Sequence, residues 1–152
     1  MNITTRKAEK SDIQTIAENI SNMALEIADK EIAQHTSYKG AEFIMKNSEL
    51  GFYIVAETQN ENVGSLLILN EWSAWNNRMR WRIETVYVSP QYRQKGVYRA
   101  MYEFVKKQAQ LSPEILELKL ETDETNTKAR KTYEKLGMHL SNKTTYASGH
   151  LK

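Results

Sequence analysis

The chain has 152 residues, of which 40% are hydrophobic and 26% are charged, and its formal net charge at pH 7 is +2. This composition is typical of a globular protein with one core, so we expect a single domain over residues 1–152. The absence of cysteine excludes disulfides, thiolate metal sites and cysteine nucleophiles. No apolar run is long enough to span a membrane, and we expect a cytoplasmic protein with no membrane contact.

The first half of the chain predicts a strand, two helices and an antiparallel hairpin. Apolar residues recur at helical spacing from Ile13 to Ile27, and two β-type runs flank a polar turn at residues 59–62. In chain order these elements are expected at residues 2–6, 11–27, 40–47, 52–56 and 63–70.

The second half predicts strands that alternate with helices. After a polar loop at 71–79, we expect a strand, a helix, a strand, a helix and two short strands, at residues 81–88, 96–111, 116–120, 127–136, 138–140 and 144–148. The connection from Val88 through a helix to Leu116 requires parallel pairing of its two strands. The whole order predicts an α/β (α+β) fold with a mixed sheet of about seven strands, flanked by about four helices.

The segment from Val86 to Tyr98 combines a strand, a basic turn and a glycine that enters a helix. The first amides of a helix have no intrahelical partner, and the helix dipole adds positive charge there. Arg93 and Lys95 contribute full charges, and Gly96 lets the main chain approach a ligand. This arrangement suits a phosphate or pyrophosphate, although a solvated turn that is merely basic fits the segment equally well.

Two motifs follow one another within this frame. Residues 93–98 read Arg-Gln-Lys-Gly-Val-Tyr, and residues 126–137 contain Asn126, Ala129, Tyr133 and a terminal Leu-Gly. In these motifs the chain resembles the GNAT superfamily of acyl-CoA-dependent N-acyltransferases, whose signature is Arg or Gln, two residues, Gly, one residue, then Gly or Ala. The chain departs from this signature at the last position, where Tyr98 stands in place of Gly or Ala. The run Glu-Trp-Ser-Ala-Trp at 71–75, together with Val-Tyr-Arg-Ala at 97–100, is similar to a bacterial subgroup in which an aromatic residue is usual at that position.

The resemblance implies a GNAT fold in which parallel strands 4 and 5 splay apart, with acetyl-CoA as co-substrate and no metal. It places the pyrophosphate on the amides from Gln94 to Arg99 and the pantetheine beside the main chain of Val86 and Val88. A main-chain N–H such as that of Val86 then faces the developing oxyanion. The expected cofactor-binding residues are Val86, Tyr87, Val88, Arg93, Gln94, Lys95, Gly96, Val97, Tyr98, Arg99 and Asn126.

Tyr133 and Asn126 each have two interpretations. The resemblance implies that Tyr133 is the general acid for the leaving thiolate, whereas its shared stripe with Ala129 and Leu136 fits a core aromatic residue. We favour the catalytic role. Asn126 corresponds to an asparagine near the cofactor, but an asparagine ahead of a helix is more often its N-cap, and both roles are compatible.

Glu84 is the candidate general base. Strand alternation predicts that Arg82, Glu84, Val86 and Val88 share one face, which would turn the carboxylate toward the cofactor. Glu84 fits an ion pair with Arg82 or Arg80 equally well. A carboxylate of ordinary pKa does not strongly deprotonate an alkylammonium, so burial or a water chain would be needed.

Three tryptophans, Trp72, Trp75 and Trp81, flank the loop at 71–79. They fit the wall of an acceptor pocket, a lid on the core or a dimer contact. The histidines show no metal-ligand spacing, and no Ser-His-Asp or Walker pattern is present.

These observations predict an N-acetyltransferase that moves an acetyl group from acetyl-CoA to a primary amine by direct attack in a ternary complex. We expect a small-molecule amine rather than a protein amine as acceptor, and a homodimer. A catalytically silent acyl-CoA-binding or regulatory module on the same fold is the alternative. Arginines 78, 80, 82, 93 and 99 with Lys95 could instead form a nucleic-acid surface, but the net charge near zero argues against it.

Overall fold

The computed structural model describes residues 1–151, and the chain divides into two compact units, residues 1–121 and the residues from Thr122 onward. The described part of the second unit, residues 122–151, contains one helix, α4 (Thr127–Lys135). The elements of the first unit are β1 (Thr4–Lys7), α1 (Ile13–Ala28), α2 (Gln34–Lys46), β2 (Gly51–Thr58), β3 (Glu61–Ser73), β4 (Arg78–Val88), α3 (Val97–Gln110) and β5 (Ile115–Leu120).

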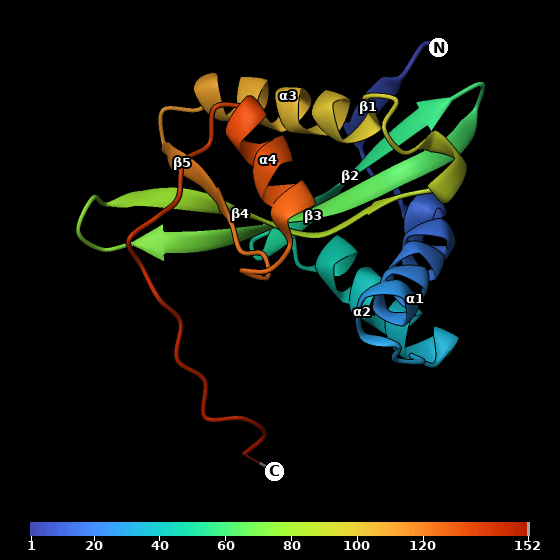
Figure 1. Ribbon diagram of the computed structural model, residues 1–152, viewed down its shortest axis with the longest axis horizontal. Coiled ribbons are helices and arrows are strands. Elements are labelled where there is room, and N and C mark those ends of the chain that lie inside the picture. Colours follow the sequence, from blue (N-terminus) through green and yellow to red (C-terminus); the bar gives the residue numbers. More distant parts are fainter. Residues whose placement is uncertain (152) are drawn as a thin grey trace. The chain divides into compact units, whose positions relative to one another are not determined.

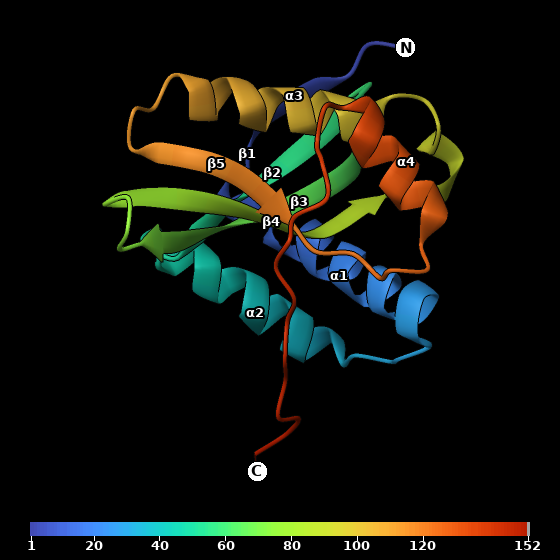
Figure 2. The ribbon, with the colours of Figure 1, turned by 60° about the vertical axis from the view of Figure 1, so that its left-hand side comes forward.

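The first unit is a mixed sheet between two layers of helices. Its five strands lie in the order β1-β2-β3-β4-β5. The first four pair antiparallel, and β5 joins β4 in parallel after the crossover through α3, as the strand–helix–strand pattern predicted. Helix α3 covers one face of the sheet, and α1 and α2 cover the other (Figure 1, Figure 2).

The prediction of seven strands is wrong, because residues 1–151 contain five. The segments at 138–140 and 144–148 are not strands, and they leave Leu140 81% and Tyr146 96% exposed. A hairpin of two short strands is marginal in water unless it buries an apolar face, and these segments hold few apolar side chains for that purpose. Local alternation alone was therefore a poor guide at this end of the chain.

The hairpin of β3 and β4 is longer than predicted. Residues 71–79 were expected to form a polar loop, but β3 extends to Ser73 and β4 begins at Arg78. Glu71 pairs with Arg80 and Trp72 with Met79, so the turn is confined to residues 74–77. Glu71 binds Lys119 and Arg80 binds Glu117, both in β5, so charged side chains of this polar segment have partners on a neighbouring strand.

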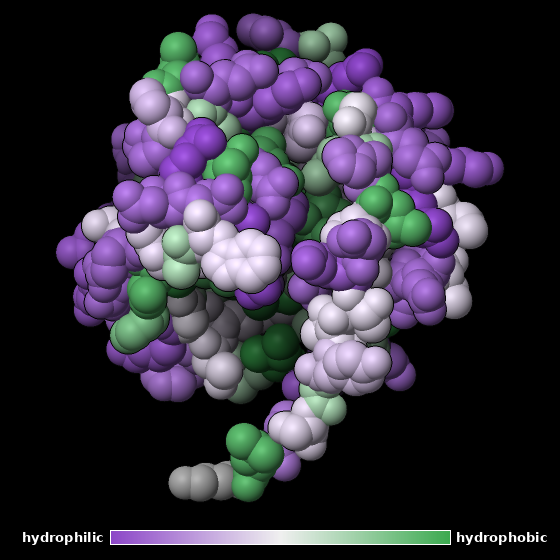
Figure 3. Space-filling view, turned by 90° about the vertical axis from the view of Figure 1, so that its left-hand side faces the viewer, coloured by the Kyte–Doolittle hydropathy of each residue, from purple (hydrophilic) through white to green (hydrophobic). Residues whose placement is uncertain are grey.

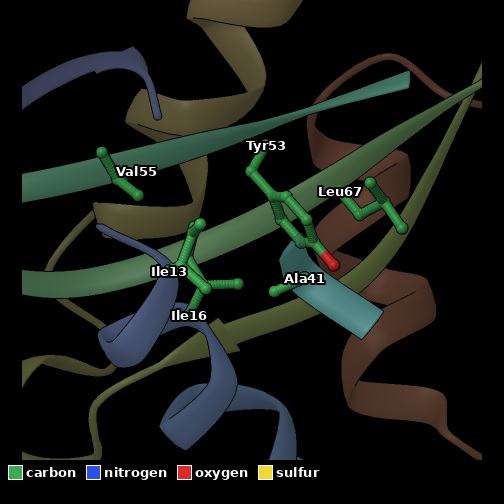
Figure 4. Close-up of a cluster of buried hydrophobic side chains, with 6 residues drawn as sticks. All are labelled: Ile13, Ile16, Ala41, Tyr53, Val55 and Leu67. Carbon is green, nitrogen blue, oxygen red and sulfur yellow. The ribbon is translucent and has the colours of Figure 1, made fainter. Parts of the chain in front are cut away.

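The core beneath α1 and α2 consists of apolar side chains from two helices and two strands. Figure 4 shows the ring of Tyr53 among these side chains, with its hydroxyl oxygen toward Ala41. The buried members are Ile13, Ile16, Ala41, Tyr53, Val55 and Leu67. Burial of aliphatic side chains of this size contributes about 1.5–3 kcal/mol each, so this cluster anchors both helices to the sheet.

A charged contact holds the short edge strand β1 to its neighbours. The Arg6 guanidinium donates to both carboxylate oxygens of Asp12, at 2.8 and 3.0 Å, and its Nε donates to Glu57 at 2.8 Å. Burial opposes ionisation of Asp12, but the hydrogen bonds from Arg6 and from the Glu9 amide outweigh it and lower the pKa of Asp12. The ionised carboxylate therefore stabilises the folded chain.

We expect Asp12→Asn to lower the free energy of unfolding at pH 7 by about 1 kcal/mol, because the pair is partly exposed. The contribution is fully present above the ordinary pKa of 3.8 and is lost as the pH falls through the lower folded value. Urea denaturation of both proteins between pH 7 and about pH 2 measures this. A difference that stayed constant over that range would contradict the ionic contribution.

Candidate functional site

The pairing of the parallel strands β4 and β5 ends before β4 does. Their pairing runs from Met79 opposite Ile115 to Ile83 opposite Leu120, the last residue of β5. Strand β4 continues beyond that point to Val88, as Figure 2 shows. We call residues 84–88 of β4 and Leu120 the fork. Within residues 1–151, no strand pairs with residues 84–88 on the side away from β3, so main-chain groups remain available there.

A β-bulge lies inside the fork. Glu84 pairs with Leu67 and Tyr87 pairs with Ser65, so Thr85 and Val86 together lie opposite the single residue Leu66. Thr85 has φ of 45°, in the left-handed region that β-branched residues rarely adopt. Such a bulge bends its strand and locally disrupts the ladder. It bends β4 just beyond the point where the pairing with β5 ends.

The bulge overturns the predicted alternation along β4. Glu84 pairs with Leu67, whereas Val88 pairs with Gly64, three residues earlier in β3 and therefore on the opposite face. Leu67 belongs to the core beneath α1 and α2, and Gly64 lies against α3. Glu84 and Val88 therefore do not share a face. The prediction was wrong because one inserted residue reverses the phase of every later side chain.

The turn before α3 presents main-chain N–H groups without internal partners. Gln94 and Gly96 adopt left-handed conformations, with φ of 61° and 85°, and Gly96 is the N-cap residue of α3. The first helical hydrogen bond runs from the Ala100 amide to the Gly96 oxygen at 3.0 Å. Within the described chain the amides of Lys95, Gly96 and Val97 have no recorded acceptor. Together with the helix dipole they suit an anion.

The side chain of Arg93 is held by protein groups. Its Nε donates to the Val88 carbonyl oxygen at 2.8 Å, and its Nη2 pairs with Glu26 of α1 at 2.7 Å. The guanidinium also lies 5.6 Å from the ring centroid of the buried Tyr87. Arg93 therefore ties the turn to the fork and to α1, a role that the signature alone did not reveal.

Two further exposed cations lie near Arg93, Lys95 in the turn and Arg99 in the first turn of α3. The Lys95 ammonium lies 5.8 Å from the Tyr92 ring centroid. The half-buried ring of Tyr98 lies beside that of Tyr102, with 6.3 Å between the ring centroids. Both residues belong to α3, so Tyr98 packs along its own helix.

Glu84 belongs to a chain of ion pairs that we call the charged strip, and it leads from β4 to β3 and β5. Arg82 binds Glu84 at 3.0 Å and lies 3.6 Å from Glu71, which in turn binds Lys119 at 2.6 Å. The predicted pairing of Glu84 with Arg82 is confirmed. The strip also explains the alternation of leucine and charge in β5, because one face of β5 is polar.

Tyr53 is a residue that the sequence did not single out. It is 4% exposed, and burial, with a smaller effect from the charge of Glu84, raises its pKa to about 12. The phenol therefore stays protonated over the physiological range. The signal in the sequence was a tyrosine hydroxyl between the apolar residues Phe52 and Ile54 of a strand.

In the second unit, α4 has well-defined ends. The Asn126 Oδ1 accepts from the Ala129 amide at 3.1 Å, which confirms the N-cap. Gly137 has φ of 89°, its amide donates to Glu134, and the Met138 amide donates to the Tyr133 oxygen at 3.0 Å. This Schellman motif confirms Gly137 as the residue that ends the helix.

Tyr133 lies on the half-buried side of α4. Burial raises the pKa of its phenol, although a hydrogen bond with Thr122 acts in the opposite direction. The hydroxyl group is therefore protonated at neutral pH, the state that a general acid requires. Tyr133 and Asn126 belong to the second unit, whereas the fork and the turn before α3 belong to the first.

The three tryptophans have different environments. Trp81 is 8% exposed and packs edge-on against Phe52, with ring centroids 5.1 Å apart, so it belongs to the core. Trp72 is 57% and Trp75 100% exposed, at the end of the β3–β4 hairpin. Hydrophilic residues predominate on the face toward which this hairpin points, and hydrophobic side chains occur there in small groups (Figure 3).

Two surface hollows, of about 300 and 550 Å³, have no fork residue in their walls. The smaller is lined by Lys10, Glu42 and Lys46 among others, and Glu42 forms ion pairs with Lys39 and Lys46 at 3.4 Å each. In residues 1–151 no group of three or more His, Asp or Glu is placed to hold a metal ion. None of the helices described is both long and apolar enough to cross a membrane.

The model of the acetyltransferase (GNAT) family matches residues 18–138. The chain belongs to this family. Among curated proteins, none matches the chain significantly. A possible acetyltransferase from Clostridium difficile 630 is 28% identical, with a TM-score of 0.92 and 100% of both chains covered.

More distant structures share the fold. A ribosomal-protein-alanine N-acetyltransferase from Brucella melitensis biovar Abortus 2308 is 15% identical, with a TM-score of 0.78 over 96% of this chain and 97% of that chain. A glucosamine-6-phosphate N-acetyltransferase from Arabidopsis thaliana is 19% identical, with a TM-score of 0.73 and 100% of both chains covered. The five-stranded mixed sheet with four helices agrees with these GNAT neighbours.

Gly96 and Gly40 form a matched pair for testing the turn before α3. An added Cβ would meet no atom within 4 Å at either position, but only Gly96 has a left-handed φ. We expect Gly96→Ala to lower the free energy of unfolding by about 1 kcal/mol and Gly40→Ala, inside α2, to raise it by about 0.5 kcal/mol. Urea denaturation measures both, and equal effects would contradict a conformational requirement for glycine at position 96.

Proposed function

We propose that this acetyltransferase-family protein transfers an acetyl group from acetyl-CoA to a primary amine by direct attack in a ternary complex. The observation that carries the proposal is the fork beside a helix start whose amides have no internal acceptor. Val88 and Arg93 link the two features through the hydrogen bond of 2.8 Å. A nucleotide thioester offers a diphosphate for the helix start and an extended arm for the free edge of a strand.

In this proposal the amides of Lys95, Gly96 and Val97 bind the diphosphate, with Lys95 and Arg99 supplying positive charge. The main chain of Val86 and Val88 binds the pantetheine, and the Val86 N–H faces the thioester oxygen. The amine nitrogen attacks the thioester carbon, the C–N bond forms and the C–S bond breaks. An oriented main-chain donor at the developing oxyanion typically contributes about 3 kcal/mol.

Two residues handle the protons. Glu84 accepts a proton from the attacking amine, directly or through water, and its place in the charged strip orients the carboxylate. Tyr133 gives its proton to the departing thiolate, and the raised pKa of its phenol supports this role because the group stays protonated. The absence of cysteine from the sequence excludes an acyl-cysteine intermediate, which favours direct attack.

The acceptor we propose is a small-molecule amine. Four of the six cations that could have formed a nucleic-acid surface are held by protein oxygens, with Arg78 on Pro113, Arg80 on Glu117, Arg82 on Glu84 and Arg93 on Glu26. They are not an unpaired basic patch, which supports the small-molecule proposal. Release of free thiol from acetyl-CoA can be followed with a panel of small amines and of peptides that have a free N-terminal amine. The compounds that react identify the acceptor class.

We expect Tyr133→Phe to lower kcat by about 10²-fold, because the thiolate then leaves without a proton donor. Affinity for acetyl-CoA, measured by calorimetry, should stay unchanged. Tyr146→Phe is the matched control, since Tyr146 lies in the same unit and is 96% exposed. An unchanged rate in Tyr133→Phe would remove this residue as the acid.

For Glu84→Gln we expect kcat/KM at neutral pH to fall by about 10²-fold. Glu117→Gln, which breaks the Arg80 pair on the same sheet, should keep the wild-type kcat/KM. If both variants retain full activity, the role of Glu84 is limited to its ion pair.

A catalytically silent acyl-CoA-binding module is the second candidate, and calorimetry separates the two. Binding of acetyl-CoA without thiol release for any amine in the panel would favour the silent module. Failure to bind either acetyl-CoA or CoA would defeat both candidates. The expected homodimer stays a prediction, which sedimentation velocity on the full chain tests.

A further inference from the structure

Thr85 combines two unfavourable features in one residue. Its φ of 45° lies in the left-handed region, where the branched Cβ of threonine crowds the backbone. Its Oγ1 is buried, and no hydrogen-bond partner for it is found among the described residues. Buried polar groups without a partner are few in native structures, and strained backbone concentrates at sites of function.

The strained backbone and the unpartnered hydroxyl of Thr85 lie inside the fork. It is the first of the two bulge residues opposite Leu66, and it lies two residues beyond Ile83, where pairing with β5 ends. Bulges with a left-handed first residue usually carry glycine there. Glycine would meet the backbone requirement without strain, so the bulge does not explain why a threonine hydroxyl is present.

A second buried donor without a partner in the described chain, the Nε of Arg82 in the charged strip, belongs to a group that is otherwise paired. The Arg82 Nε has no recorded partner among residues 1–151, but the same guanidinium binds Glu84 at 3.0 Å. The hydroxyl is the single polar group of the Thr85 side chain, and it can donate one hydrogen bond. The next residue in the chain, Val86, carries the main-chain N–H proposed above as a donor, so Thr85 and Val86 offer two successive donors in the fork.

We infer that the Thr85 hydroxyl donates a hydrogen bond to a carbonyl oxygen of the acyl-CoA bound in the fork. This inference rests on the proposed function. The carbonyl belongs either to the thioester or to an amide of the pantetheine arm. The bulge fixes the backbone that carries this donor, and donors held in place before the ligand binds are effective in catalysis. Thr85 is thus a ligand-binding residue in addition to Val86.

Thr85→Val tests the inference because valine keeps the shape and branching of threonine and removes only the hydroxyl. We expect a melting temperature equal to or above that of the wild type, since a buried unpaired polar group is lost. We expect kcat/KM for acetyl-CoA to fall by about tenfold or more. Thr85→Ser should keep most of the activity. A purely structural hydroxyl predicts the reverse, with a lower melting temperature and an unchanged rate per folded molecule.

Calorimetry with acetyl-CoA and with CoA distinguishes the two sources of the carbonyl. Weaker binding of acetyl-CoA alone by Thr85→Val assigns the bond to the thioester, and weaker binding of both ligands assigns it to a pantetheine amide. Thr5→Val, in β1, is the control and should bind both ligands normally. Should Thr85→Val fold poorly, Thr85→Gly removes the same hydroxyl on a backbone that glycine adopts freely.

The failures are distinguishable. If the wild type binds acetyl-CoA and Thr85→Val has unchanged affinity and turnover, the inference is overturned and the proposed function stands. If the wild type binds neither acetyl-CoA nor CoA, the proposed function fails and the inference fails with it.

Discussion

One additional residue in β4 governs the arrangement of the candidate site. Because Thr85 and Val86 share the single partner Leu66, β4 bends within the fork and its later side chains change face. Before the bulge, β4 has strands on both sides; after it, one edge of the strand is open. The end of β4 is thus held by β3 along one edge and is open along the other.

The distribution of charge complements this geometry. The guanidinium of Arg93 is neutralised by Glu26 and anchored to Val88, so it positions the turn, while the exposed Lys95 and Arg99 remain for a ligand. On the face of Glu84, the charged strip pairs carboxylates with cations at partly exposed positions. Such pairs contribute little to stability, about 0–1 kcal/mol each, and their effect is mainly on the orientation of the groups.

Local signals in the sequence were reliable for helix ends that a single capping residue or glycine determines. Asn126 caps α4, Gly137 ends it, and Gly96 enters α3 with a left-handed φ, each through hydrogen bonds or dihedral angles set within a few residues. The strand–helix–strand pattern likewise predicted the parallel pairing of β4 and β5. The strands expected at 138–140 and 144–148 failed because a strand also needs a partner and a buried face, which short-range alternation does not supply.

The sequence by itself determined the start of α3, the ends of α4, the order of the elements from β1 to α4 and the candidate residues Glu84 and Tyr133, but it placed the start of α2 at residue 40 instead of Gln34. Only the tertiary structure decided which face Glu84 occupies, because the bulge is a property of the pairing between β3 and β4. It also decided that Arg93 is held by Glu26, 67 positions away in the chain, and that the hydroxyl of Thr85 is buried. These outcomes depend on contacts between distant segments, and no periodicity or short motif encodes such contacts.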